Sequence, residues 1–78
     1  MPIDPIELSR ELIVFNTVNP PGNELSCIAH LETILAGAGF ETSVRRFAPD
    51  RANLVATIGG VGNKPPLCFT GHVDTVPL

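Results

Sequence analysis

The sequence predicts an α/β fold with the element order α-α-β-β-β in a chain of 78 residues. Three observations predict it. Apolar residues recur at helical spacing in two segments, residues 5–16 and 24–38. Three later segments, residues 40–47, 53–58 and 67–70, have strand-type composition and are separated by turns rich in glycine or proline. Because both helices precede all the strands, we expect a sheet with helices packed on it.

The first predicted helix begins at a capping signal. Asp4 can accept hydrogen bonds from the free N–H groups of the first turn, and Pro5 suits the first helical position. Glu7 stands where a capping box places its second acidic residue. An apolar stripe follows, and the helix should end near Asn16. The stripe consists of Leu8, Leu12, Ile13 and Phe15.

The second predicted helix is bounded by turn residues on both sides. Residues 17–23 form a loop, because they contain two consecutive prolines, which forbid helix and remove two hydrogen-bond donors. The helix then runs over about residues 24–38, and Gly37 and Gly39 are its stop signal. Its apolar stripe consists of Leu25, Ile28, Leu31, Leu35 and Ala38.

The three predicted strands differ in how they expose their faces. Apolar and polar residues alternate imperfectly over residues 40–47, which indicates a strand with one solvent-exposed face. Residues 48–50 form a turn. Residues 53–58 form the second strand, which the glycines of residues 59–63 close. Residues 67–70 are apolar on both faces apart from the last residue. That pattern is typical of a strand near the middle of a covered sheet.

Composition excludes several classes of function. Five basic residues against eight acidic ones give a net charge of −3, and Arg45-Arg46 is the only adjacent basic pair, so no basic face for nucleic acid is expected. No stretch approaches the roughly eighteen consecutive apolar residues of a membrane span. Charged residues among the first eleven exclude a secretory signal, and we expect a cytoplasmic protein.

The two cysteines predict neither a disulfide framework nor a metal site. Cys27 falls in an apolar helical pattern and Cys68 in an apolar strand pattern, and neither has a closely spaced cysteine partner. We interpret both as small buried hydrophobic residues in a reducing compartment.

The most informative segment is G-H-V-D-T-V-P, residues 71–77, directly behind the third predicted strand. In an extended chain His72 and Asp74 point to the same face. A histidine in such a pair can bind a metal through one ring nitrogen while the carboxylate fixes its tautomer through the other. The alternative is a surface histidine beside an aspartate in a loop. That alternative is favoured for H-x-D alone, whereas the whole run behind an apolar strand favours the metal site.

Other candidate residues have simpler structural interpretations. The glycines of residues 59–62 could suggest a phosphate loop, but no predicted helix follows them, so a connecting turn is favoured. His30 lies off the main apolar stripe and indicates a partly solvated helical histidine. Glu24 is interpreted as a first-turn acid favoured by the helix dipole. Arg45 and Arg46 are interpreted as exposed strand residues.

These segments together resemble a known family. L-C-F-T-G-H-V-D-T-V-P, residues 67–77, resembles the first metal motif of the co-catalytic zinc amidohydrolases, which include acetylornithine deacetylase, succinyl-diaminopimelate desuccinylase, aminoacylases and glutamate-releasing carboxypeptidases. The N-terminal helix, the N-T-V-N-P-P-G-N-E loop, the helix end G-A-G-F and the strand R-A-N-L-V-A-T-I-G agree in order and spacing. The resemblance covers essentially the whole chain and roughly the first fifth of a member of about four hundred residues in two domains.

The resemblance implies a fold and a reaction. Residues 1–78 would be the N-terminal fragment of a three-layer, zinc-peptidase-like catalytic domain with a mixed sheet, truncated after its third strand, with the dimerisation or lid domain absent. The whole protein would be a homodimeric, metal-dependent hydrolase that cleaves the amide bond of N-acyl amino acids or small peptides, as deacetylases and desuccinylases do.

The resemblance also implies roles for two residues. His72 matches a histidine that binds one of two Zn²⁺ ions, with Co²⁺ or Mn²⁺ as possible substitutes, and Asp74 matches the catalytic carboxylate that orients this imidazole. The general base and the other ligands would lie beyond Leu78. The isolated fragment is therefore expected to be inactive.

A function of a different class stays open from the sequence. The chain could be a standalone interaction or assembly module that acts without catalysis. It would use the exposed edge of an incomplete sheet, which favours self-association.

Overall fold

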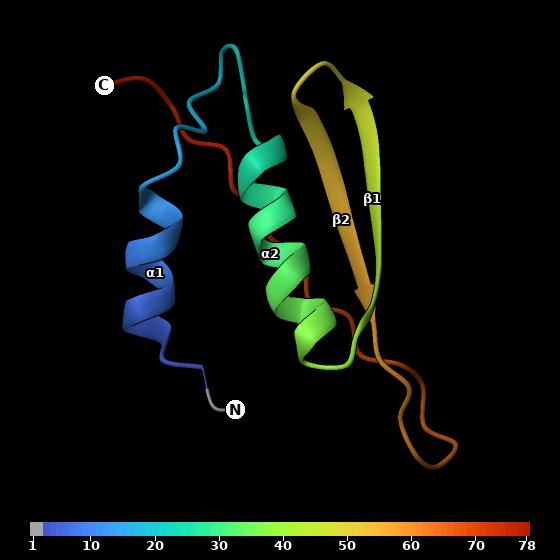
Figure 1. Ribbon diagram of the computed structural model, residues 1–78. Helices are drawn as coiled ribbons and strands as arrows, with labels where there is room; N and C mark the ends of the chain where they lie inside the picture. Colours follow the sequence, from blue (N-terminus) through green and yellow to red (C-terminus); the bar gives the residue numbers. More distant parts are fainter. Residues whose placement is uncertain (1–2) are drawn as a thin grey trace.

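The computed structural model describes residues 3–78, in which two helices precede an antiparallel β-hairpin (Figure 1). The elements are α1 (Pro5–Ile13), α2 (Leu25–Gly37), β1 (Glu41–Ala48) and β2 (Arg51–Thr57). Helix α2 packs against both strands, and α1 lies on the other side of α2. The predicted α/β class is thus confirmed, whereas the described residues form two strands rather than three. No helix among them is long and apolar enough to cross a bilayer.

Helix α1 begins where the capping signal predicts but is shorter than expected. The Oδ1 of Asp4 accepts a hydrogen bond from the backbone N–H of Ile6 at 2.9 Å. The predicted capping box is wrong, because Glu7 Oε1 instead accepts from Arg10 Nη1 at 3.0 Å. The helix ends at Ile13, before the predicted end near Asn16, and Ile13 and Val14 at this end are 80% and 82% exposed, so their packing adds little support to a further helical turn.

Helix α2 matches its predicted bounds to within one residue. Its C-terminus is closed by Gly39 in the left-handed region, with φ +99°. Gly39 N–H donates to the Ala36 carbonyl at 3.1 Å, and Phe40 N–H donates to the Leu35 carbonyl at 3.0 Å. This pair of bonds is a Schellman motif, and its αL position favours glycine because other residues carry a Cβ penalty there.

The hairpin is tighter than the sequence suggests. Ala48 pairs with Arg51, so Pro49-Asp50 is a two-residue turn and β2 begins two residues before its predicted start. Asp50 adopts φ +57°, a conformation that aspartate tolerates in turns. The register shifts between Arg46 and Ala48, which places a bulge at this end of β1. The turn thereby brings the first residue of β2 close to the start of α2.

The buried core is small and lies between α2 and the hairpin. Its fully buried apolar members are Cys27, Ile28 and Ala52, with 2%, 6% and 5% exposure. Burial of Cys27 is confirmed, and it raises the pKa of that thiol. The matching prediction for Cys68 is wrong, because this cysteine is exposed.

The predicted third strand, residues 67–70, is wrong for the described chain. The segment has no ladder partner, and Leu67 and Phe69 are 80% and 88% exposed. A strand requires a neighbour for its backbone N–H and C=O groups, and the hairpin edges do not lie against this segment. Instead, the C-terminal segment passes behind α2 and emerges between α2 and α1 (Figure 1).

A buried ion pair joins the start of α2 to the start of β2. Arg51 Nη2 lies 2.6 Å from Glu24 Oε1, and Arg51 Nε donates to both carboxylate oxygens of Glu24 at 3.0–3.1 Å. The interpretation of Glu24 as a first-turn acid is therefore incomplete: it occupies the N-cap position without a side-chain cap bond and is 5% exposed. A Cβ on Gly22, which has φ +76°, would lie 2.7 Å from the guanidinium. Glycine there lets the loop pass over the pair.

The ion pair makes stability depend on pH with a definite sign. The Arg51 guanidinium holds the pKa of Glu24 below its ordinary value of 4.5, so the folded chain binds fewer protons than the unfolded chain in that range. The contribution of Glu24 to the free energy of unfolding is therefore complete above pH 4.5. It is lost as the pH falls through the lower pKa of the folded state.

We expect Glu24→Gln to lower the urea midpoint of the chain at pH 7, because it leaves the Arg51 guanidinium without its anionic partner. The difference between wild type and variant should shrink as the pH falls below 4.5 and through the lower pKa of Glu24 in the folded state, since Glu24 then becomes protonated in the folded wild type as well. Circular dichroism during urea titration measures both effects. Glu41→Gln, at an exposed glutamate of β1, is the control, and an equal pH dependence of both variants would contradict the assignment.

Candidate metal centre

The H-x-D motif lies in an extended segment that runs between α2 and α1 rather than at the end of a paired strand. The loop before α2 holds it in place. Thr17 Oγ1 donates to the Val73 carbonyl at 2.7 Å, and Thr75 N–H donates to the Thr17 carbonyl at 3.0 Å. Asn19 N–H donates to the Thr75 carbonyl at 2.8 Å, which completes a parallel bridge between Val18 and Thr75. The motif is therefore fixed by residues more than fifty positions away in the sequence.

Thr17 is buried to 5% exposure at the centre of this contact. Its hydroxyl and its backbone carbonyl both bond to the motif segment, so burying these polar atoms leaves them satisfied. Val73, between the two motif residues, is half-buried on the inner side. Alternation along the extended chain then turns His72 and Asp74 to the opposite side.

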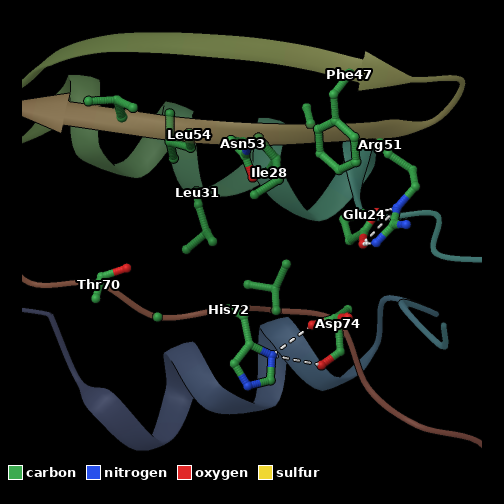
Figure 2. Close-up of a pocket in the computed structure, with 14 residues that line it drawn as sticks. Glu24, Ile28, Leu31, Phe47, Arg51, Asn53, Leu54, Thr70, His72 and Asp74 are labelled. Carbon is green, nitrogen blue, oxygen red and sulfur yellow. Dashed lines mark hydrogen bonds and ion pairs between the residues drawn. The ribbon is translucent and has the colours of Figure 1, made fainter.

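His72 and Asp74 are in direct contact (Figure 2). His72 Nδ1 lies 2.7 Å from Asp74 Oδ1 and 3.1 Å from the backbone carbonyl oxygen of Asp74. A carbonyl oxygen can only accept, so Nδ1 is the donor and carries the hydrogen. The neutral imidazole then has its lone pair on Nε2. The His72 side chain is 82% exposed, and this lone pair is accessible to a cation.

Asp74 is held by two hydrogen bonds, one to each carboxylate oxygen. Oδ2 accepts from Asn19 Nδ2 at 3.1 Å, while Oδ1 accepts from His72. These bonds, first that from Asn19 and then that from His72, hold the pKa of Asp74 below its ordinary value. Asp74 is therefore an anion at neutral pH, which suits a group that orients an imidazole.

A groove opens beside the pair, with a volume of about 650 Å³. Figure 2 shows β2 on one side of it and the segment from Thr70 to Asp74 on the other. Ile28 and Leu31 of α2 line it with apolar atoms, and the Glu24–Arg51 pair lies at its polar end. The groove thus combines an apolar wall with charged groups near Asp74.

Among residues 3–78 the structure offers one side chain suited to the predicted ligand role and no complete set of ligands. Within residues 3–78, no group of three or more His, Cys, Asp or Glu side chains could hold a metal ion. Structural and catalytic zinc sites use at least three protein ligands. His72 fits one position of such a site through Nε2, while both oxygens of Asp74 are occupied by hydrogen bonds. The metal-binding role of His72 and the orienting role of Asp74 stay predictions.

The remaining candidates agree with their structural interpretations. His30 Nε2 lies 3.0 Å from Glu11 Oε1, and the His30 ring packs 5.5 Å from the ring of Phe15, so this histidine joins α2 to α1. No helix follows the glycines of residues 59–62, as a connecting turn requires. Arg45 and Arg46 are exposed on β1.

Sequence reasoning missed three residues that support the pair. Thr17 and Asn19 bind the motif segment directly, and Arg51 fixes the loop that carries them through Glu24. The available signal was a cluster of polar side chains around two prolines, in a loop too rigid to be a simple connection. Nothing in the spacing indicated that this loop meets the chain at Val73 to Thr75.

The two histidines should show opposite neutral tautomers. His72 donates from Nδ1, whereas His30 Nε2 faces an acid and should carry its hydrogen there. Asp74→Asn offers an amide donor to Nδ1, so it should shift His72 toward the Nε2–H tautomer and leave His30 unchanged. Long-range ¹H–¹⁵N correlation spectra measure both tautomers. A wild-type His72 in the Nε2–H form would contradict the geometry.

Comparison with known proteins identifies close similarity to one group of enzymes. The chain is 44% identical over 78 residues to succinyl-diaminopimelate desuccinylase of Wolbachia pipientis subsp. Culex pipiens (strain wPip). The aligned region covers 99% of this chain and 18% of the relative. The chain is 41% identical over 78 residues to the enzyme of the same name from Ehrlichia canis (strain Jake), covering 99% and 20%. The Rickettsia typhi enzyme is 34% identical over 70 residues, covering 87% and 18%.

No family model matches the chain, and no solved structure matches it significantly. The chain spans about a fifth of the length of the curated relatives it matches. The similarity nevertheless extends over nearly all of its residues and includes both the loop before α2 and the H-x-D segment. Over nearly its whole length the chain is thus similar to enzymes named succinyl-diaminopimelate desuccinylase, a resemblance that its motifs predicted.

Proposed function

We propose that this chain is the part of a metal-dependent desuccinylase or deacylase that supplies one metal ligand, His72, and its orienting carboxylate, Asp74. The observation that carries the proposal is the bond from His72 Nδ1 to Asp74 Oδ1 at 2.7 Å, which leaves Nε2 accessible. It coincides with 40–44% identity to several enzymes named desuccinylases.

The donor chemistry of His72 fits a zinc ion. A metal-binding histidine commonly donates its second ring N–H to a carboxylate or a backbone carbonyl, and His72 Nδ1 does both. Asp74 stays ionised because two donors hold it, so it stabilises positive charge on the ring. When bound, a pair of zinc ions would activate water and polarise the amide carbonyl of the substrate.

The substrate proposed here is the amide bond of an N-acyl amino acid. Relatives bear the name succinyl-diaminopimelate desuccinylase, and succinyl-diaminopimelate is therefore the first substrate to test. Other N-acyl amino acids and small peptides are the wider class. Residues 3–78 offer a groove with one polar end and no group of three or more His, Cys, Asp or Glu side chains that could hold a metal ion.

The rest of the catalytic site is proposed to lie outside these 78 residues. The relatives are about five times longer, which leaves room for the remaining ligands, the general base and a dimerisation or lid domain. In this proposal residues 1–78 are the N-terminal part of the catalytic domain, the isolated chain is inactive, and the whole protein is a cytoplasmic homodimer.

Replacement of His72 by alanine in the longer protein tests the metal assignment. We expect the variant to bind fewer zinc ions per subunit and to lose more than about 100-fold in hydrolysis of succinyl-diaminopimelate, because a ligand matters at least as much as the groups behind it. Metal analysis after dialysis and an assay of amine release measure the two effects. His30→Gln is the matched control, since His30 contacts Glu11 and Phe15 instead. Unchanged zinc content in His72→Ala would refute the proposal.

A second function, a non-catalytic assembly module, is favoured by one observation. Large apolar side chains are exposed along the C-terminal segment and at the end of α1, including Ile13, Leu67, Phe69 and Val76 at 80–88% exposure. Exposed apolar surface of this kind marks contact surfaces. In the desuccinylase proposal, the rest of the longer protein covers these residues.

Sedimentation of the 78-residue chain at micromolar concentration separates the two functions. An assembly module should form an oligomer of defined size, and Phe69→Glu should dissociate it by placing a charge in the apolar contact. The desuccinylase proposal predicts no defined oligomer and no effect of that substitution on size. A discrete, Phe69-dependent oligomer would favour the module.

A further inference from the structure

We propose that Asn19 is a positioning residue for the His72–Asp74 pair, an inference that rests on the proposed function. Its side-chain amide would hold the Asp74 carboxylate in the rotation that presents Oδ1 to His72. Asn19 would touch neither substrate nor metal. Its effect would reach the metal through Asp74 and then through the imidazole.

The first argument is that each oxygen of the Asp74 carboxylate accepts a hydrogen bond from a different side chain. Asn19 Nδ2 donates to Oδ2 of Asp74 at 3.1 Å, and His72 Nδ1 donates to Oδ1 at 2.7 Å. The terminal torsion of an aspartate is broad when nothing constrains it. Donors on both oxygens fix the plane of the Asp74 carboxylate. Removal of Asn19 therefore frees the carboxylate to turn away from the imidazole ring.

The second argument is that the backbone, rather than the side chain, places Asn19. Asn19 N–H donates to the Thr75 carbonyl at 2.8 Å, directly beside Asp74. Gly22 N–H donates to the Val18 carbonyl at 2.8 Å and closes the turn that contains the two prolines. The Asn19 amide is therefore delivered to Asp74 by bonds that a side-chain substitution leaves in place.

The third argument is chemical. A carboxylate only accepts hydrogen bonds, so its second partner must be a donor. An amide donates without adding charge, whereas an aspartate at position 19 would place a second anion about a hydrogen-bond length from Asp74. Asparagine thus orients the anion without competing for the cation that His72 would bind.

The arrangement predicts a graded loss of metal affinity in the full-length protein. Partners behind a ligand are typically worth 10–100-fold in metal affinity, so we expect Asn19→Ala to weaken zinc binding by about 10-fold. Asn19→Asp keeps the size of the side chain and should weaken binding further, because it replaces the donor by a like charge. Competition of the apoprotein with a chromogenic chelator measures zinc affinity without an activity assay.

Two control variants separate positioning from general support of the loop. Thr17→Val removes the hydroxyl bond to Val73 but leaves both oxygens of Asp74 partnered. Asn23→Ala changes an exposed asparagine of the same loop. Asn23→Ala should keep zinc affinity within about twofold of wild type, and Thr17→Val should weaken it less than Asn19→Ala does. Thermal melting of each variant reports whether the protein is folded. The His72 tautomer, read by NMR, should become mixed only in the Asn19 variants.

The outcomes distinguish this inference from the proposed function. If His72→Ala weakens zinc binding and Asn19→Ala does not, the positioning role of Asn19 is refuted and the proposed function stands. An equal loss in Asn19→Ala and Thr17→Val would also refute it, since the effect would then come from the loop as a whole. If His72→Ala leaves zinc affinity unchanged, the proposed function fails and this inference with it.

Discussion

The parallel bridge between the loop before α2 and the C-terminal segment is the contact on which the candidate site depends. Thr17 and Asn19 bond to the backbone on either side of Asp74, and this contact joins two parts of the chain separated by more than fifty residues. The motif has no ladder partner among the described residues beyond this bridge. The geometry of His72 and Asp74 is therefore a property of the loop as much as of the motif.

The loop is in turn fixed by a charge contact between Glu24 and Arg51, away from His72. Glu24 and Arg51 join the start of α2 to the hairpin turn, and Gly22 is small enough to lie against the guanidinium. A bidentate pair at a buried position resists rotation more than a single hydrogen bond does. The ion pair fixes the direction in which the loop that contains Asn19 enters α2. The Glu24–Arg51 ion pair and the backbone bridge between Val18 and Thr75 thus fix the position of Asp74 relative to the small core.

The sequence predicted those features that depend on nearby residues. The N-cap at Asp4, the glycine end of α2 and the hairpin strands follow from local capping, turn and periodicity rules. The contact between His72 and Asp74 was also expected, because two residues at i and i+2 in an extended chain share a face. Features that depend on distant residues were missed. Glu24 looked like an ordinary first-turn acid because its partner, Arg51, is 27 residues away.

The prediction of a strand at residues 67–70 was wrong because a strand, too, depends on residues distant in the sequence. The run is apolar on both faces, which is a pattern of burial in a covered sheet, yet the described chain leaves Leu67 and Phe69 exposed. An apolar pattern records the environment for which a segment is suited, whereas a strand also needs hydrogen-bonding neighbours. Relatives about five times longer contain additional chain that could supply them. The mismatch between pattern and exposure therefore supports the proposal that these residues belong to a longer catalytic domain, and it lies next to the groove that His72 and Asp74 line.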